Sequence, residues 1–210
     1  MKKELNYFYI DGSYGGSQGW FTNIVMRIGG CAAAAACDSS IYFAREKNLK
    51  ILCPFEAQIS ESLTKENYIA FSQMMKPYIK PRMSGVKKLS WYIEGYQSYI
   101  REAQKTKKRN EITDIDIKEF TGGHSFLEAK EVVKLQIQKG IPIPFLLLKH
   151  QNNRFSDFVW HWFLLTEFEE CGEEFYVTAA TYGQAHKLPF RELWDTGFPE
   201  KGGMILYDIK

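Results

Sequence analysis

Apolar side chains recur at helical spacing through much of the first half of the chain. In residues 63–79 and 86–106 they stand three or four positions apart, which predicts two amphipathic helices. Nothing interrupts a helix between Cys31 and Glu46, and five consecutive alanines in this segment favour one strongly. Because small side chains surround the segment, neighbouring elements can approach it from every side. We therefore expect a helix buried in the middle of the molecule.

The second half of the chain has the pattern of strands, interrupted by one helix. Ser125 and Glu128 form a capping box, which predicts a helix that runs to Gln138 and is closed by Gly140. A short strand is also expected near the start of the chain, at residues 7–10. Further strands are predicted at residues 112–117, 141–149, 158–166, 174–181 and 204–209, and a strand or helical turn at 187–194. Prolines at the beginning of 141–149 predict that the start of this strand lies near an edge of the sheet.

Helices in the first half and an antiparallel sheet in the second indicate an α+β fold rather than alternating βαβ units. The chain has 210 residues, of which 45% are hydrophobic and 15% aromatic, which is ample for a packed core. We expect one domain over residues 1–210, with a mainly helical lobe at 1–110 and a mainly β lobe at 111–210.

Charge and composition narrow the expected partners. The net charge of +2 is nearly balanced, so we expect neither nucleic acid nor an anionic membrane as the main partner. No apolar run approaches the ~20 residues needed to cross a bilayer, and the apolar segment near the start is too short for a signal sequence. We therefore expect a cytoplasmic protein with reduced thiols. The glycine-rich stretch 12–19 lacks the lysine of a phosphate loop, and no Cys or His spacing resembles a zinc site, so we predict no cofactor and no metal.

The main candidate for chemistry is Cys31, which opens the alanine-rich helix after Gly29 and Gly30. A thiol at the positive end of a helix dipole is expected to have a lowered pKa, which favours the nucleophilic thiolate. The two glycines have no side chains, so a substrate carbonyl could approach the sulfur. The alternative is a small apolar cysteine that only packs in the core.

A thiolate nucleophile needs a base, which is normally a histidine from another part of the fold. His124, His150 and His186 have the surroundings of loop or surface residues. His161 differs, because it lies within a strand between two tryptophans and by alternation shares a face with apolar residues. A buried imidazole needs a polar partner, so His161 is either a satisfied core histidine or a base directed at the thiol.

These residues carry a resemblance to a known family. A buried helix that starts with Cys31, followed by a helical lobe and then a sheet bearing His161, resembles the papain-like cysteine peptidases. The sequence is most similar to the branch that processes bacteriocin leader peptides, where a G-x-P stretch like Gly140-Ile-Pro142 also precedes the histidine strand. The resemblance covers residues 14–194. It implies a papain-like fold and a hydrolase that cleaves a peptide or amide bond through a Cys31–His161 pair.

The resemblance also implies supporting residues. A glutamine upstream of the cysteine donates to the oxyanion in this family, which points to Gln18, although the gap is longer than usual and Asn23 is the alternative. The family's Asn or Asp after the histidine strand is replaced by Ala180 in Ala180-Thr-Tyr-Gly183, so Thr181 or Asp157 would have to orient the imidazole. This departure leaves two alternatives open: a non-catalytic relative that binds a peptide or small ligand in the same groove, and an acyltransferase.

Overall fold

A single antiparallel sheet organises the β part of the molecule. The computed structural model describes residues 1–55, 63–82, 84–105 and 114–210. Within these residues the sheet has seven strands, in the order β4-β9-β5-β6-β7-β8, and β1 pairs with the part of β6 beyond the end of β5. The strands are β1 (Lys2–Glu4), β4 (Ile115–Thr121), β5 (Ile143–Leu147), β6 (His161–Cys171), β7 (Glu174–Thr181), β8 (Gln184–Pro189) and β9 (Gly202–Ile209). A separate small hairpin consists of β2 (Tyr9–Ile10) and β3 (Ser13–Tyr14).

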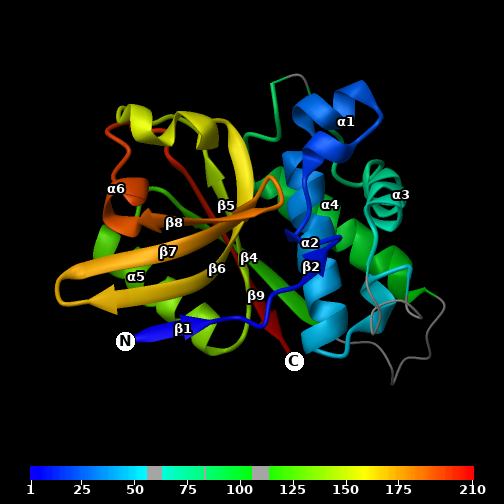
Figure 1. Cartoon of the computed structure of the whole chain (residues 1–210), viewed down its shortest axis with the longest axis horizontal. Helices are drawn as coiled ribbons and strands as arrows, with labels where there is room; N and C mark the ends of the chain where they lie inside the picture. Colours follow the sequence, from blue (N-terminus) through cyan, green and yellow to red (C-terminus); the bar gives the residue numbers. More distant parts are fainter. Residues whose placement is uncertain (56–62, 83, 106–113) are drawn as a thin grey trace.

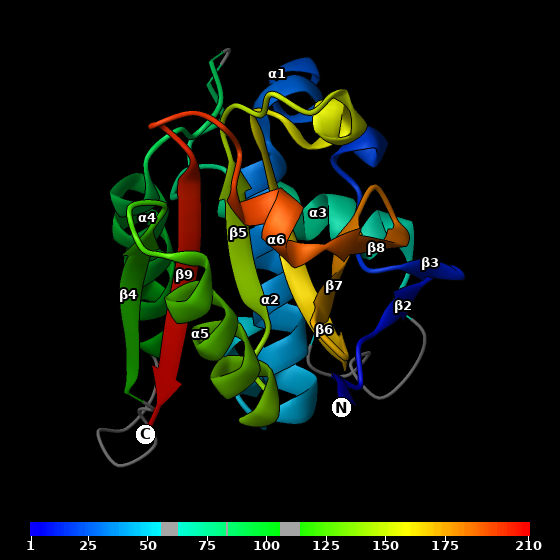
Figure 2. The ribbon, with the colours of Figure 1, turned by 90° about the vertical axis from the view of Figure 1, so that its left-hand side faces the viewer.

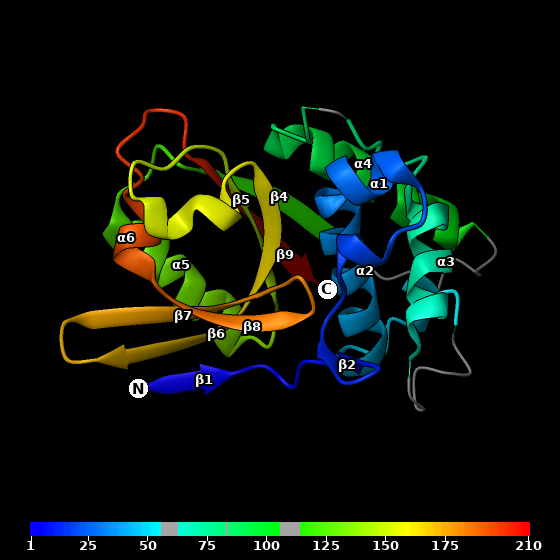
Figure 3. The same ribbon diagram turned by 45° about the horizontal axis from the view of Figure 1, so that its top comes forward.

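Helices cover both faces of this sheet. On one face lies α2 (Cys31–Glu46), with α3 (Lys65–Met75) and α4 (Leu89–Gln104) beyond and beside it, and on the other face lies α5 (Phe126–Gln138) (Figures 1, 2 and 3). Aromatic contacts mark the two faces, since Trp162 of β6 stacks on Tyr92 of α4, whereas its neighbour Phe163 stacks on Phe145 of β5. The shorter elements are α1 (Ile24–Gly29), α6 (Phe190–Trp194) and the 3-10 turns η1 (Gln18–Trp20), η2 (Lys50–Leu52) and η5 (Asn153–Phe158).

The α+β class and several elements agree with the expectations from sequence. Helix α2 spans Cys31–Glu46 as predicted, and nearly all of its residues are buried. The capping box of α5 is present, with Ser125 and Glu128 bonding each other's backbone N–H groups, and Gly140 follows the helix at a φ of 70°. Helices α3 and α4 lie inside the segments predicted at 63–79 and 86–106, of which residue 106 falls outside the described part of the chain. Residues 112 and 113 of the strand predicted at 112–117 also fall outside it, and β4 begins at Ile115.

One of two expectations about strands is wrong. The start of the strand at 141–149 does have a free side, as its prolines predicted, although the rest of β5 is paired with β6 on one side and β9 on the other. Its pairing with β9 begins only at Phe145, so Pro142 and Pro144 precede the part that has two neighbours, where a missing N–H is tolerated. The strand at 158–166 begins only at His161, because the preceding residues form η5. In the described parts of the chain, none of the helices combines the length and apolarity that a membrane crossing requires.

Candidate active site

Four side chains that the sequence singled out line one small cavity of about 20 Å³. They come from four separate segments: Gln18 from η1, Cys31 from the first turn of α2, His161 from the start of β6 and Thr181 from the end of β7. The fold therefore brings these side chains together across more than 160 residues of sequence. The full lining consists of Gly16, Gln18, Cys31, Ala34, Ala35, Asp38, residues 161–164 and residues 180–182.

Cys31 is the first residue of α2 and is only 4% exposed. Burial raises the pKa of its thiol to about 11, although N–H groups of Trp162, Ala32 and Cys31 itself act in the opposite direction. The expectation of a lowered pKa is therefore wrong for this conformation. The helix terminus does favour the thiolate, but loss of hydration disfavours the charged form more strongly. At neutral pH the sulfur carries its proton.

The two glycines before Cys31 are also required by packing. A Cβ on Gly29 would lie 2.3 Å from the carbonyl oxygen of Arg82, and a Cβ on Gly30 would lie 2.3 Å from that of Met26. Backbone thus occupies the space that a side chain would take. These glycines therefore allow a close approach of the backbone at Arg82 and Met26.

The imidazole of His161 is held by Thr181. Its Nε2 lies 2.7 Å from Thr181 Oγ1, and the ring of Tyr182 is stacked on it at a centroid distance of 4.6 Å and an interplanar angle of 4°. Burial lowers the pKa of His161 to about 4. Asp157, the other candidate partner, contributes only its backbone carbonyl, which accepts a hydrogen bond from the Tyr182 hydroxyl at 2.9 Å. With Nε2 bound, Nδ1 is the nitrogen available for proton transfer.

The turn between β7 and β8 fixes these partners of the imidazole. Tyr182 and Gly183 both have positive φ, 54° and 72°, as in a two-residue type I′ hairpin turn. Glycine adopts this conformation without strain, but a tyrosine does not. Trp160, directly before His161, is also in the left-handed region at a φ of 57°. Strained aromatic residues thus lie directly before the histidine and against its ring, a pattern that is common at functional sites.

The structure distinguishes the two candidates for the upstream amide. Gln18 lines the cavity, and its Oε1 is buried without a hydrogen-bond partner. Asn23 instead caps α1, since its Oδ1 accepts the backbone N–H of Met26 at 3.1 Å. The additional residues between Gln18 and Cys31 form α1, so the longer gap does not prevent Gln18 from reaching the cavity.

The remaining histidines lie outside this cavity. His124 pairs with Glu128 on the surface, and the ring nitrogens of His150 bond to backbone groups of Glu192 and Asn152. His186 is half-buried on β8 and packs edge-on against Phe158. In the described parts of the chain, no cluster of three or more His, Cys, Asp or Glu side chains could hold a metal ion.

Sequence reasoning missed two residues of the cavity, Asp38 and Tyr182. Asp38 lies two helical turns after Cys31, so it belongs to the same face of α2. A lone carboxylate in an alanine-rich, otherwise apolar stretch was a detectable signal, because a buried charge needs a reason. Tyr182 had no such signal, since its position over the imidazole depends on the geometry of the turn.

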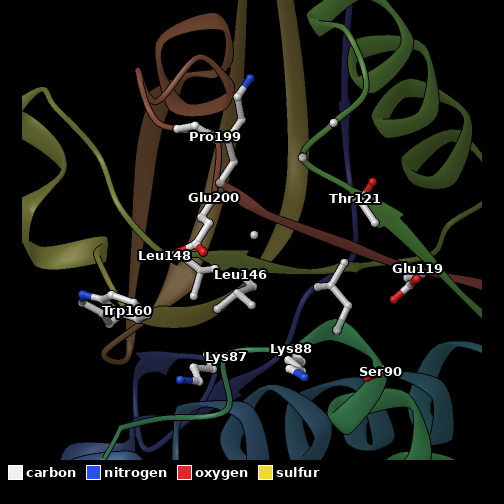
Figure 4. A pocket seen from close by; sticks show the side chains of 15 residues that line it. Lys87, Lys88, Ser90, Glu119, Thr121, Leu146, Leu148, Trp160, Pro199 and Glu200 are labelled. Atoms are coloured by element: carbon white, nitrogen blue, oxygen red, sulfur yellow. The ribbon is translucent and has the colours of Figure 1, made fainter.

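Cys31 also lines a second, more open hollow. This Cys31 groove, with a volume of about 390 Å³, is lined by Ile28, Gly29, Cys31, Ser84, Gly85, Lys87 and Trp160. Ile28 and Trp160 are 53% and 46% exposed, so the groove is accessible from solvent. Lys87 and Trp160 also line a larger pocket of about 640 Å³, which we call the α4 pocket because it reaches the start of α4 (Figure 4). The two hollows are therefore adjacent.

No protein family model matches this chain, and comparisons with curated proteins and with solved structures find no significant match.

Proposed function

We propose that the protein is a papain-like cysteine hydrolase that cleaves a peptide or amide bond. The observation that carries this proposal is the convergence of Cys31, His161, Gln18 and Thr181 on one cavity, with the imidazole held by a hydroxyl at 2.7 Å. A nucleophile, a base, a group that orients the base and an amide donor are the parts that acyl transfer by a thiol requires.

In the proposed reaction, the sulfur of Cys31 attacks the carbonyl carbon while its proton passes to Nδ1 of His161. The carbonyl π electrons move to oxygen, and the amide of Gln18 and the backbone N–H of Cys31 stabilise the resulting oxyanion. The intermediate then collapses, the C–N bond breaks and His161 returns the proton to the departing amine. This leaves a thioester on Cys31.

The thioester is resolved by water. His161 takes a proton from the water as its oxygen attacks the thioester carbonyl, and the sulfur leaves with the proton that the imidazole held. The product is a carboxylic acid, and the thiol is restored. Atoms and charges balance over the two halves, and no cofactor takes part in these steps.

The protonation states favour a concerted transfer over a preformed ion pair. Burial holds the pKa of Cys31 at about 11 and that of His161 at about 4, so both groups are neutral in the free protein at pH 7. The proton therefore moves as the sulfur attacks, when the oxyanion donors compensate the developing charge. The form in which both the thiol and the imidazole are neutral exists at pH values between these two pKa values. Activity is expected to fall below pH 4, because His161 then becomes protonated.

The groove beside Cys31 gives the substrate a path. A substrate peptide that enters along Ile28 would bring a carbonyl group to the sulfur of Cys31. The rest of the peptide would then pass Trp160 and Lys87 into the α4 pocket (Figure 4). The exposed indole offers a flat apolar surface for a substrate side chain. An extended peptide fits this arrangement better than a compact small molecule.

One observation favours a second candidate function, a non-catalytic relative that binds a peptide in the same groove. The neutral state of both Cys31 and His161 is what an inert, buried pair would have. In that case a peptide would bind equally well to the wild type and to Cys31→Ala, and neither would release products.

The deciding experiment incubates the protein with a mixed peptide library and detects new termini by mass spectrometry. We expect cleavage by the wild type and a loss of at least about 10³-fold in both Cys31→Ala and His161→Ala. The matched control is Cys171→Ala, because Cys171 is an exposed thiol remote from the cavity and its loss should leave cleavage unchanged. Equal cleavage by the wild type and Cys31→Ala would contradict the proposal.

A further inference from the structure

Asp38 is a buried acid on the cavity that the reaction above does not use. Cys31, Ala34, Ala35 and Asp38 follow one another at helical spacing and all line the cavity. Asp38 is 4% exposed, and burial raises the pKa of its carboxyl group to about 6. An apolar residue would fill this position at lower cost, so the retention of an acid needs an explanation.

One carboxylate oxygen anchors the segment that carries Gln18. Asp38 Oδ2 accepts hydrogen bonds from the Tyr7 hydroxyl at 2.8 Å and from the backbone N–H of Gly16 at 3.2 Å. The segment passes so close that a Cβ on Gly15 would lie 2.9 Å from the same oxygen. Because Gly16 is only two residues from Gln18, this bond fixes where the amide side chain starts.

The other carboxylate oxygen of Asp38 resembles the side-chain oxygen of Gln18. Asp38 Oδ1 and Gln18 Oε1 are both buried acceptors that lack a hydrogen bond of normal geometry, and both residues line the cavity. The Tyr68 hydroxyl donates to Ala34 O at 3.2 Å, and it also lies close enough to Asp38 to act against the rise in the pKa of its carboxyl group. Leaving a buried acceptor unpaired costs about 1–3 kcal/mol. The cavity volume of about 20 Å³ suits a single water molecule, and one water has two protons to give, one for each acceptor.

The anchored segment also supports the imidazole side. Gly16 O accepts the N–H of Gly183 at 3.1 Å, and Gly183 O accepts the N–H of Tyr14 at 2.8 Å. Gly183 belongs to the turn that places Thr181 and Tyr182 against His161. Through Gly16, Asp38 is therefore linked both to the segment that carries Gln18 and to the turn that contacts His161.

We propose that Asp38 is a positioning residue, which holds Gln18 through the N–H of Gly16 and, across the cavity, through one water shared by Asp38 Oδ1 and Gln18 Oε1. With Oε1 held in this way, the Nε2 of Gln18 is directed to the oxyanion. This inference rests on the proposed function, because an oxyanion forms only if Cys31 attacks a carbonyl.

Two reagents separate positioning of the oxyanion donor from reactivity of the thiol. Iodoacetamide alkylates sulfur by displacing iodide and forms no oxyanion. The thiol adds to the carbonyl of the aldehyde acetyl-Ala-Ala-alaninal and forms a hemithioacetal. The former carbonyl oxygen then accepts the same hydrogen bonds as the oxyanion of the proposed reaction. The affinity of the protein for the aldehyde is measured from the concentration of aldehyde that protects Cys31 from alkylation by iodoacetamide. Mass spectrometry follows the alkylation of Cys31.

We expect Gln18→Ala and Asp38→Ala each to weaken aldehyde binding by at least about 10-fold, since each removes or misplaces one oxyanion donor. The double variant should be no weaker than either single variant, because the two residues act as a unit. Alkylation by iodoacetamide should stay unchanged. Asp38→Asn should bind the aldehyde nearly as the wild type does, because its oxygen accepts from Gly16 and its amide donates towards Gln18.

Ser40→Ala is the matched control for loss of a buried polar group on α2. Ser40 Oγ bonds the Tyr96 hydroxyl at 2.9 Å on another side of the helix, so this variant should bind the aldehyde normally. Wild-type affinity in Asp38→Ala, or additive losses in the double variant, would overturn the inference while leaving the proposed function intact. A wild type that reacts with neither reagent would instead contradict the proposed function.

If Asp38→Ala does not fold, the crystal structure of the wild type supplies the decision. Electron density for one water between the carboxyl group of Asp38 and the amide of Gln18 would support the inference. A Gln18 side chain turned away from Asp38 would overturn it.

Discussion

Two polar faces of helix α2 are built in contrasting ways. On one face, hydroxyl groups satisfy one another: Ser40 Oγ and Tyr96 OH are 2.9 Å apart, and Tyr207 OH lies 2.9 Å from Tyr92 OH and 3.3 Å from Ser39 Oγ. The other face, which bears Cys31 and Asp38, borders the cavity. In the described residues three buried polar side-chain atoms lack a partner, and two of them, Gln18 Oε1 and Asp38 Oδ1, belong to residues that line this cavity.

The contrast separates structural from functional polarity. A satisfied network fixes the packing of a core and leaves nothing available for a ligand. Unsatisfied acceptors and strained aromatic residues lower stability, and proteins retain them mainly at functional sites. The Cys31 face has both, with Trp160 and Tyr182 in left-handed conformations near it. Perturbing the two faces should therefore have different consequences.

The largest expected effect is on the pH dependence of stability, where two groups of the cavity act in opposite directions. The pKa of His161 is lowered from 6.5 to about 4, so the unfolded chain binds more protons in that range and the contribution of His161 is lost as the pH falls. The pKa of Asp38 is raised from 3.8 to about 6, so its contribution is lost as the pH rises through that range. Each of these pKa shifts changes the free energy of unfolding by about 3 kcal/mol.

Urea unfolding of the wild type, His161→Gln and Asp38→Asn between pH 4 and 6.5 measures these contributions. As the pH falls, His161→Gln should gain about 3 kcal/mol relative to the wild type and Asp38→Asn should lose about 3 kcal/mol. Differences from the wild type remove the contribution of the surface carboxylates. If the free energy of unfolding changed with pH in the same way in all three proteins, neither His161 nor Asp38 would have the shifted pKa that the prediction requires.

The next effect concerns the satisfied face. Tyr207→Phe removes the hydroxyl that is hydrogen-bonded to the buried hydroxyl of Tyr92, which should lower the free energy of unfolding by about 2 kcal/mol. Peptide cleavage and the alkylation rate of Cys31 should not change. Tyr9→Phe is the control, because Tyr9 is 59% exposed and should be neutral. A change in cleavage without a loss of stability would show that the two faces are not separate.

The smallest effect is expected at the partner of the imidazole. Thr181→Val keeps the shape of the side chain but removes the hydroxyl bound to His161 Nε2. We expect cleavage to fall about 10-fold, a part of the 10²–10⁴ that a positioned base supplies. Thr181→Ser should retain most activity because it keeps the hydroxyl. Unchanged cleavage in Thr181→Val would mean that Tyr182 alone is sufficient to orient the ring.

Much of the candidate site could be found from sequence, because its strongest signals are local. The bounds of α2 follow from a run of helix-forming residues. Cys31 stands out at its start, and His161 stands out as a polar residue between tryptophans in a strand. These features need only the spacing of neighbouring residues.

The choice between alternatives depended on contacts between distant segments. Sequence favoured Thr181 as the partner of the imidazole and kept Asp157 as an alternative, and in the structure it is the Thr181 hydroxyl at the β7–β8 turn that contacts the ring. Sequence also left Gln18 and Asn23 open, and the use of Asn23 as a helix cap decides for Gln18. Neither outcome can be read from local spacing.

The sequence by itself determined the α+β class and the central helix, and it singled out Cys31 and His161 as candidates. Only the tertiary structure decided their protonation. The helix dipole, a local property, favours a thiolate at Cys31, whereas the sheet and its loops remove water from both groups and raise one pKa to about 11 while lowering the other to about 4. Hydration depends on everything that packs around an atom, and no stretch of sequence contains that information.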